Sequence, residues 1–363
     1  MSEPTAIRHI PGDVIRDQIE AVLTAWGVAA DPAATAAEAL ADADLHGVDS
    51  HGVGLVPMYD QRRGQGRINV SATPTVVREK GAVALIDADK SLGHPVSVQA
   101  MQLACDKARE TGVALVGVRN SNHFGAAGYY SRMAARQGMI GMAMTHAPGP
   151  AIVPTFGRDA ALGTNPIAFA APAKANKPFA LDMATSTVAL NKVRNYFRRG
   201  KAIPDGWAMD HEGQPTTNPE IGYQARRVTP VGGTRDLGSH KGYGLAMMVE
   251  ILCAVLTGAW SEPGETDAEG RPVKSPNQTG HFFLAIDPNR LRDGEEFGED
   301  LDRMIDMLHA TPPVDPARPV LVAGDPEYAM YAERSKTGVP LPETLLGELR
   351  EVVARCNAPW LMG

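Results

Sequence analysis

Cysteine is scarce in this chain of 363 residues. The three cysteines, Cys105, Cys253 and Cys356, lie far apart and form neither a CxxC metal or redox motif nor a disulfide framework. This pattern excludes a small disulfide-stabilised domain and favours a reducing compartment. Residues 1–13 also lack the apolar core of a secretion signal. We therefore expect a cytoplasmic protein.

The chain also lacks a net positive charge and a long apolar run. The formal net charge is -7 at pH 7, which argues against a general nucleic-acid-binding protein. The longest apolar run, residues 244–259, is shorter than a bilayer-spanning helix and contains Glu250. We expect neither a nucleic-acid nor a membrane partner. The composition, with 44% hydrophobic and 21% charged residues, is typical of a globular protein. The length of 363 residues suggests two or three domains.

The usual signatures of cofactor and metal sites are missing as well. No GxGxxG follows a predicted strand, which excludes the common Rossmann fingerprint, and no GxxxxGK[ST] phosphate-binding loop occurs. The sequence also contains no HExxH zinc motif and no GxSxG nucleophile motif. We expect no metal ion, and the site has to be sought in less familiar patterns.

Short β-branched runs and runs of helical period alternate along the chain, which predicts an α/β (α+β) fold. Strands are predicted at residues 83–87, 113–119, 140–145, 167–171, 179–183 and 282–286. Helices are predicted at residues 14–26, 32–45 (with Asp31 as N-cap), 50–62 (with Ser50 as N-cap), 96–111, 129–137, 243–256, 290–309 and 342–356. Residues 260–280 are polar and rich in proline and glycine, which predicts a surface loop.

The first candidate site is the DSHG segment at residues 49–52. A histidine beside a hydroxyl, as in Ser50-His51, can relay protons. A helix N-terminus disfavours the charged imidazolium, so His51 would need a compensating carboxylate to act as an acid. The alternative interpretation is a capped helix with a histidine that faces solvent.

The second candidate is the NSNHFG segment at residues 120–125, which follows a predicted strand. Polar residues and glycines at a strand end are common at ligand sites, and the backbone N–H groups of residues 125–128 could meet a phosphate. The alternative is a strand-to-helix turn with a capping asparagine.

Two further segments complete the set. Asp182 follows an apolar run, and a buried carboxylate there needs a partner such as a histidine, unless Asp182 merely caps a helix. The SHKGYG segment at residues 239–244 places Lys241 and glycines at a predicted helix start, which favours an anion site for phosphate. A glycine-rich loop without a ligand is the alternative for this segment.

Together these segments resemble the type-2 malate/L-lactate dehydrogenase family of NAD(P)-dependent oxidoreductases. The resemblance runs from about residue 14 to residue 349. Its motifs are DSHG (49–52), SNHFGAAGYYS (121–131), LGTNPIAFAAP (162–172), LDMATS (181–186), PDGWAMD (204–210), GQPTTNP (213–219) and HKGYGL (240–245). It implies a non-Rossmann, mixed-sheet NAD(P)-binding domain at residues 76–309. It also implies a helical domain built from residues 1–75 and 310–363, and a homodimer.

The resemblance also implies roles for individual residues. His51 matches the proton donor of the family, with Ser50 and Asp182 in a supporting relay, and His123 matches a histidine assigned as the acid/base in some members. Thr164 and Tyr59 match substrate contacts. The matches to cofactor-binding positions for NAD or NADP are His123, Phe124, Gly125, Ala126, Ala127, Asp182, Met183, Ala184, His240, Lys241, Gly242, Gly324 and Asp325.

One position departs from the family pattern. Members usually carry SHGxxR, whose arginine is suited to a bidentate grip on a carboxylate, and Leu55 stands there in this chain. Either another cation, such as Arg62 or Arg63, binds the carboxylate, or the substrate differs.

The resemblance implies hydride transfer between a nicotinamide and a 2-oxo or 2-hydroxy acid. Reduction of a cyclic imine, such as piperideine- or pyrroline-2-carboxylate, is an alternative. A non-catalytic dinucleotide-binding protein is a second alternative.

Overall fold

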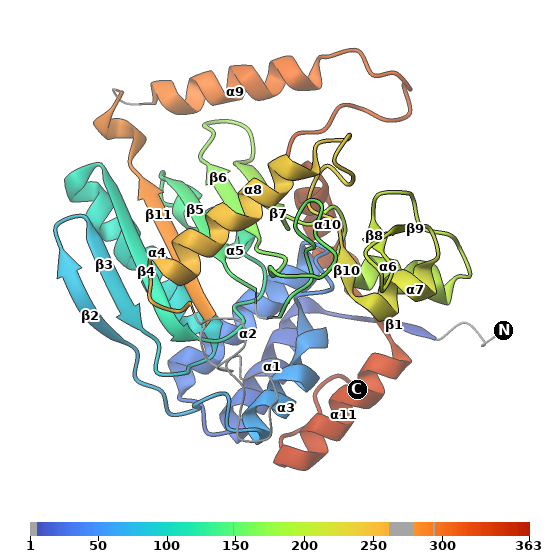
Figure 1. The fold of residues 1–363 in the computed structure, drawn as a ribbon. Helices are drawn as coiled ribbons and strands as arrows, with labels where there is room; N and C mark the ends of the chain where they lie inside the picture. The colour runs from blue at the N-terminus through green and yellow to red at the C-terminus, as the bar shows by residue number, and fades with distance from the viewer. Residues whose placement is uncertain (1–5, 148, 261–278, 293–294) are drawn as a thin grey trace.

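The computed structural model describes residues 6–147, 149–260, 279–292 and 295–363. Its centre is a mixed sheet with the strand order β2-β3-β4-β11-β5-β6-β7 (Figure 1). Strands β3 and β4 are parallel and the other neighbours are antiparallel, so the predicted α/β class with a mixed sheet is confirmed. The strands are β2 (Thr75–Lys80), β3 (Val83–Asp87), β4 (Val113–Ser121), β5 (Ile140–Thr145), β6 (Ile167–Ala171), β7 (Phe179–Met183) and β11 (Thr279–Ile286).

Helices cover both faces of this sheet because alternate residues of its strands point to opposite sides. On β4, Val116 and Val118 pack into the core under α4 (Gly93–Thr111) and α5 (Gly128–Ala135). Leu115 packs on the other side, in a cluster with Val249 and Cys253. Those two residues belong to α8 (Ser239–Glu250) and to the π-helical turn Ile251–Val255 that continues it.

The two ends of the chain meet in a second, helical core. Strand β1 (Ile7–Ile10) pairs antiparallel with β12 (Val339–Pro342). One cluster of buried side chains joins the early helices with the last one, for example Ile19, Leu40 and Leu346. The helices are α1 (Gly12–Ala25), α2 (Ala30–Leu45), α3 (Val56–Gly64) and α11 (Glu343–Cys356). The domain boundaries at residues 75 and 310 remain a prediction.

Several small elements were not predicted. Helices α6 and α7 pack beside a sheet of two-residue strands in the order β10-β8-β9, and α10 follows the long helix α9 (Figure 1). The bounds of these unpredicted elements are α6 (Leu190–Arg198), β8 (Ala208–Met209), β9 (Pro215–Thr216), α7 (Pro219–Ala225), β10 (Arg227–Val228) and α10 (Asp325–Thr337). The helix predicted at residues 290–309 is α9 (Glu296–His309), and a 3₁₀ turn lies at Pro288–Arg290.

Three local predictions need correction or fall outside the structure. Helix α2 starts at Ala30, so Asp31 lies in its first turn and is not the N-cap. Ser50 caps no helix: a 3₁₀ turn begins at Val53, and the Ser50 hydroxyl contacts His51. Of the predicted loop at 260–280, residues 261–278 lie outside the described part, and residues 279–280 begin β11. Among the described helices, none is long and apolar enough to cross a membrane.

Candidate active site

A cavity of about 780 Å³ lies between the end of α2, the start of α5, strand β7 and the start of α10. Its wall includes most of the side chains that the sequence singled out for proton transfer and substrate binding. These are Ser50, His51, His123, Thr164 and Asp182. Segments that are more than 130 residues apart in the sequence thus meet at one hollow, as expected for an active site.

Within the described part of the chain, His51 has one side-chain hydrogen-bond partner. Its Nδ1 lies 2.8 Å from the Ser50 hydroxyl, which can either donate to this nitrogen or accept from it. Its ring stacks on that of His123 with 5.5 Å between centroids. Burial lowers the pKa of His51 below its usual value. The structure thus pairs the hydroxyl and the imidazole that the sequence singled out, and their role in proton transfer stays a prediction.

His123 is held in one protonation state. The backbone N–H of Gly125 donates to His123 Nδ1 at 3.2 Å, and an amide N–H can only donate. Nδ1 therefore carries no proton, and the neutral ring bears its hydrogen on Nε2. The hydroxyl of Tyr59, 2.8 Å away, donates to the same Nδ1. Burial, followed by the charges of His51 and His94, lowers the pKa of His123 well below its usual value.

Tyr59 lies behind His123 and does not line the cavity. Its side chain is 1% exposed, and its hydroxyl lies between His123 and the fully buried His94, 3.5 Å from His94 Nε2. Burial lowers the pKa of His94 to about 3, so that ring is neutral as well. The Tyr59 hydroxyl thus faces two histidines, and its predicted contact with the substrate stays a prediction.

Asp182 is positioned by a helix. Its Oδ2 accepts a 2.7 Å hydrogen bond from the N–H of Gly128, at the start of α5. The side chain is open to the cavity, yet enclosure by protein raises its pKa to about 6. Within the described residues, no hydrogen bond joins Asp182 to a histidine, so the predicted Asp–His pair is wrong. The residue serves the N-terminus of α5, because a carboxylate there meets an unpaired amide and the helix dipole.

The predicted cofactor positions fall into two groups. One group lines the cavity and consists of His123, Gly125, Ala126, Ala127, Asp182, Ala184 and Gly324. The other group does not line it. Phe124 is 1% exposed and stacks on His281 inside the core, and Met183 is absent from the cavity wall.

The remaining members of the second group lie farther along the chain. His240 and Lys241 are exposed at the start of α8, where His240 contacts Arg235. A side chain at Gly242 would overlap the backbone of Val231, so close packing explains that glycine. Asp325 bonds His309 and the N–H of Val322. The structure therefore does not bring these predicted positions together with the histidines.

The sequence missed several residues of the wall. They are polar side chains from α5, α7 and α10: Arg132, Tyr223, Arg226, Glu327 and Tyr328. Arg132 follows Gly128 by four residues, so helical spacing from the start of α5 could have indicated it. The others lie on or beside helices that were not predicted.

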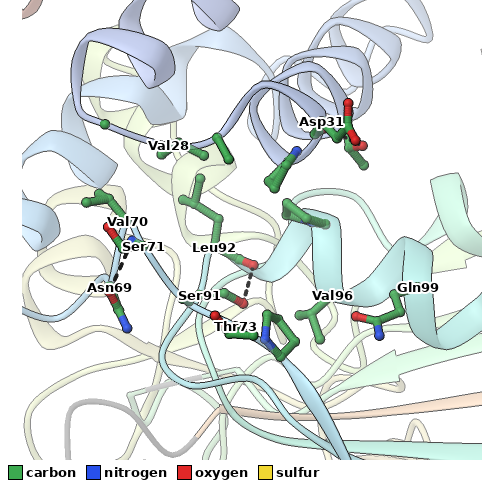
Figure 2. Close-up of a pocket in the computed structure, with 17 residues that line it drawn as sticks. Val28, Asp31, Asn69, Val70, Ser71, Thr73, Ser91, Leu92, Val96 and Gln99 are labelled. Atoms are coloured by element: carbon green, nitrogen blue, oxygen red, sulfur yellow. Dashed lines mark hydrogen bonds between the residues drawn. The ribbon is translucent and has the colours of Figure 1, made fainter.

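A second cavity, of about 540 Å³, lies between the α1–α2 turn, residues 69–74 and the start of α4. Figure 2 shows mainly apolar side chains around it, including Val28, Val70, Leu92 and Val96. Of the residues that line it, Asp31 alone carries a charge. It contains no histidine or cysteine, so it lacks the proton-transfer groups of the first cavity.

Within the described parts of the chain, no group of three or more metal-ligating side chains occurs.

Comparison with known proteins shows the family of this chain. The family model for malate/L-lactate dehydrogenase matches residues 10–350. This chain belongs to that family. The malate dehydrogenase of Pyrococcus horikoshii is 41% identical over 359 residues, which is 97% of either chain. The L-sulfolactate dehydrogenase of Methanothermobacter thermautotrophicus is 39% identical over 90% of this chain and 91% of its own.

Solved structures show the same relationship. The P. horikoshii malate dehydrogenase structure aligns with a TM-score of 0.86 at 37% identity and covers 99% of both chains. The sulfolactate dehydrogenase of Methanocaldococcus jannaschii aligns with a TM-score of 0.87 at 34% identity, over 97% of this chain and 98% of its own. The resemblance seen in the sequence is confirmed, and this chain is an oxidoreductase of the dehydrogenase class.

Proposed function

We propose that this enzyme transfers hydride reversibly between the nicotinamide of NAD or NADP and the C2 carbon of a 2-oxo or 2-hydroxy acid. One observation carries the proposal. Two histidines, His51 and His123, face one cavity with their rings stacked, and their hydrogen bonds give them different protonation behaviour. Carbonyl reduction needs one group that orients the oxygen and another that supplies a proton.

The cavity wall fits a nicotinamide. Residues 125–128 of the wall are Gly-Ala-Ala-Gly, and the small residues Ala180, Ala184 and Gly324 also line the cavity. Gly125 has a φ of 75°, and a Cβ there would lie 2.8 Å from His94 Nε2, so larger residues are excluded. Such a smooth wall admits a flat ring. The bound nicotinamide supplies the hydride, and the protein supplies orientation and the proton.

The two histidines then take different roles. Because Nδ1 of His123 is tied to Gly125 and Tyr59, its Nε2–H is the group left to hold the substrate oxygen. His51 exchanges the proton with that oxygen. Ser50 lies at Nδ1 of His51, and in this proposal its hydroxyl accepts from Nδ1–H. Nε2 is then the atom that gains and loses the proton. A lowered pKa makes protonated His51 a stronger acid toward a carbonyl oxygen that becomes an alkoxide.

We further propose supporting roles for Thr164 and Asp182. Thr164 lines the cavity and offers a hydroxyl to the substrate. Asp182 keeps the start of α5 in place and presents its carboxyl group to the same space. The segment with His240 and Lys241 lies outside the cavity, so a contact with the distal part of the dinucleotide remains a prediction.

The test is the nicotinamide absorbance during turnover, with NADH and NADPH each assayed against 2-oxo acids and cyclic imines. Oxidation of cofactor with a 2-oxo acid supports the proposal and shows the cofactor preference. Oxidation with cyclic imines alone overturns the proposed substrate class. Cofactor binding without oxidation of any substrate contradicts the proposed reaction.

We also propose a cytoplasmic homodimer. The dimer is supported by a row of exposed apolar side chains at the end of α8 and in the turn that follows, with Ile251 50%, Val255 55% and Leu256 57% exposed. Contiguous exposed apolar side chains mark interaction surfaces, and a second copy of this chain is the proposed occupant. Analytical ultracentrifugation of the wild type and of Ile251→Asp tests this. A monomeric wild type contradicts it.

A further inference from the structure

We propose that Arg62 binds the carboxylate of the substrate and thereby selects 2-oxo acids over other carbonyl compounds. The inference rests on the proposed hydride transfer to an oxo acid and adds the group that recognises the acid. It derives from the position of Arg62, its electrostatic surroundings and the engagement of the neighbouring arginines.

Arg62 is in the right place. It lines the cavity together with His51 and His123. It follows Tyr59 by three residues on α3, so the two side chains share one face of that helix. Tyr59 in turn bonds His123 Nδ1. The charge of Arg62 is one of the causes that lower the pKa of His123. The guanidinium therefore lies close to the histidine that would hold the substrate oxygen.

The guanidinium of Arg62 has no anionic partner in the described part of the chain. Its side chain is half-buried, and burial lowers its pKa from the usual value, with the charge of Arg67 adding to this effect. Removing an unpaired cation from water is unfavourable unless an anion compensates it. A carboxylate in the cavity would provide that anion through charge-assisted and bidentate hydrogen bonds.

Other residues at or near the cavity wall are less suited than Arg62 to bind the carboxylate. Arg132 pairs with Asp42, and Arg226 is exposed. Leu55, where the family pattern has arginine, packs against the helical core.

Arg63, the other cation near position 55, is occupied elsewhere. It donates to Asp60 at 3.0 Å and lies 5.2 Å over the ring of Trp26. Among the arginines of the cavity wall that the structure describes, Arg62 is thus the one that is partly buried without an anionic partner.

The arrangement predicts a defined substrate class. The oxygen of the reacting carbonyl is held at His123, and the anion is held at the neighbouring Arg62, so the two groups must be adjacent in the substrate. A carboxylate bonded directly to the carbonyl carbon meets this requirement, as in a 2-oxo acid. A neutral ester or amide of the same acid would keep the contact with His123 and lose the charge-assisted contact with Arg62.

The experiment compares Arg62→Gln and Arg62→Lys with Arg63→Gln as the matched control. Each variant is assayed with a 2-oxo acid and with its ethyl ester, and the binding of oxamate, an unreactive analogue, is measured by calorimetry. Loss of a charge-assisted contact predicts that kcat/KM for the acid falls roughly 10- to 100-fold in Arg62→Gln, mainly through KM. The ester is expected to change less than about twofold, and oxamate binding to weaken in parallel. Arg63→Gln should leave the ratio of acid to ester unchanged.

Chemical rescue adds a second readout. Guanidinium at low millimolar concentration should restore part of the acid turnover of Arg62→Ala and none for Arg63→Ala. An unchanged acid-to-ester ratio in both Arg62→Gln and Arg62→Lys, with wild-type turnover of 2-oxo acids intact, overturns the role of Arg62 alone. If the wild type reduces no 2-oxo acid, the proposed function is wrong, and the proposed role of Arg62 is wrong with it.

Discussion

The loop that carries His51 and the strand end that carries His123 place the same residue type on one cavity, yet they treat it differently. His51 meets a hydroxyl that can donate or accept, at 2.8 Å. His123 meets a backbone N–H and a buried phenol on one ring nitrogen. A hydroxyl permits a change of protonation state, whereas a fixed N–H opposes it. The donors behind each ring therefore decide which histidine moves a proton and which one holds the substrate.

The largest expected effect comes from removing the proton-transfer group. His51→Asn should lower kcat by roughly 100- to 10,000-fold, which is the usual contribution of general acid–base catalysis. The pH dependence of kcat should vanish with it. His123→Asn should lower kcat/KM as well, but it should keep the pH dependence, because His51 remains. Steady-state kinetics from pH 5 to pH 9 decide between the two, with cofactor fluorescence as the check on folding. A pH dependence that vanishes in His123→Asn instead would reverse the assignment.

A smaller effect is expected from displacing the loop that carries His51 while the strand end that carries His123 stays in place. Asp44 is 1% exposed, and its Oδ2 accepts from the N–H of Val53 at 2.7 Å, behind the loop with His51. A Cβ at Gly52 would overlap the Asp44 carboxylate. Gly52→Ala should therefore displace the loop and cost about 1–3 kcal/mol of unfolding free energy, together with a drop in kcat.

Gly54→Ala is the matched control for that change. The nearest atoms to its Cβ would lie at 3.7 Å, an ordinary contact distance. Urea unfolding and kcat of both variants provide the measurement. Equal stability and equal turnover in Gly52→Ala and Gly54→Ala would mean that Asp44 does not position the His51 loop.

The smallest effect on turnover is expected from a substitution of Tyr59, which lies behind His123. Tyr59→Phe removes one of the two donors to Nδ1, while the N–H of Gly125 remains. The tautomer should therefore survive, and kcat/KM should fall only about 2- to 10-fold, the value of one neutral hydrogen bond. Tyr130→Phe is the control, because its hydroxyl is also buried but bonds the carbonyl of Phe124. A loss of more than about 1,000-fold in Tyr59→Phe would show that the phenol itself takes part in proton transfer.

The sequence predicted the sheet better than the periphery. The runs at 140–145, 167–171 and 179–183 match β5, β6 and β7 because short apolar runs that begin beside a glycine or a proline leave a clear local pattern. The pairing of β1 with β12 joins segments more than 320 residues apart, and no local pattern encodes it. Two-residue strands such as β8 carry too little pattern to be found.

The site was predicted in its residues more than in its contacts. Ser50, His51, His123 and Asp182 do share one cavity. The partner of Asp182 turned out to be the amide of Gly128, since helix α5 starts beside the end of β7 and its first N–H groups need acceptors. A backbone turn and the packing of α3 determine which donors face His123 Nδ1. Neither feature can be predicted from the residue types alone.

The most direct test of this account is a ¹⁵N NMR titration of the imidazole groups, assigned with the single variants His51→Asn and His123→Asn. His51 should titrate with a pKa below the ordinary value of about 6.5. It becomes protonated as the pH falls through that pKa, so the rate of carbonyl reduction should fall as the pH rises above it. His123 should keep its proton on Nε2 and stay neutral from about pH 5 to pH 8. Protonation of His123 at Nδ1 within that range would contradict the account.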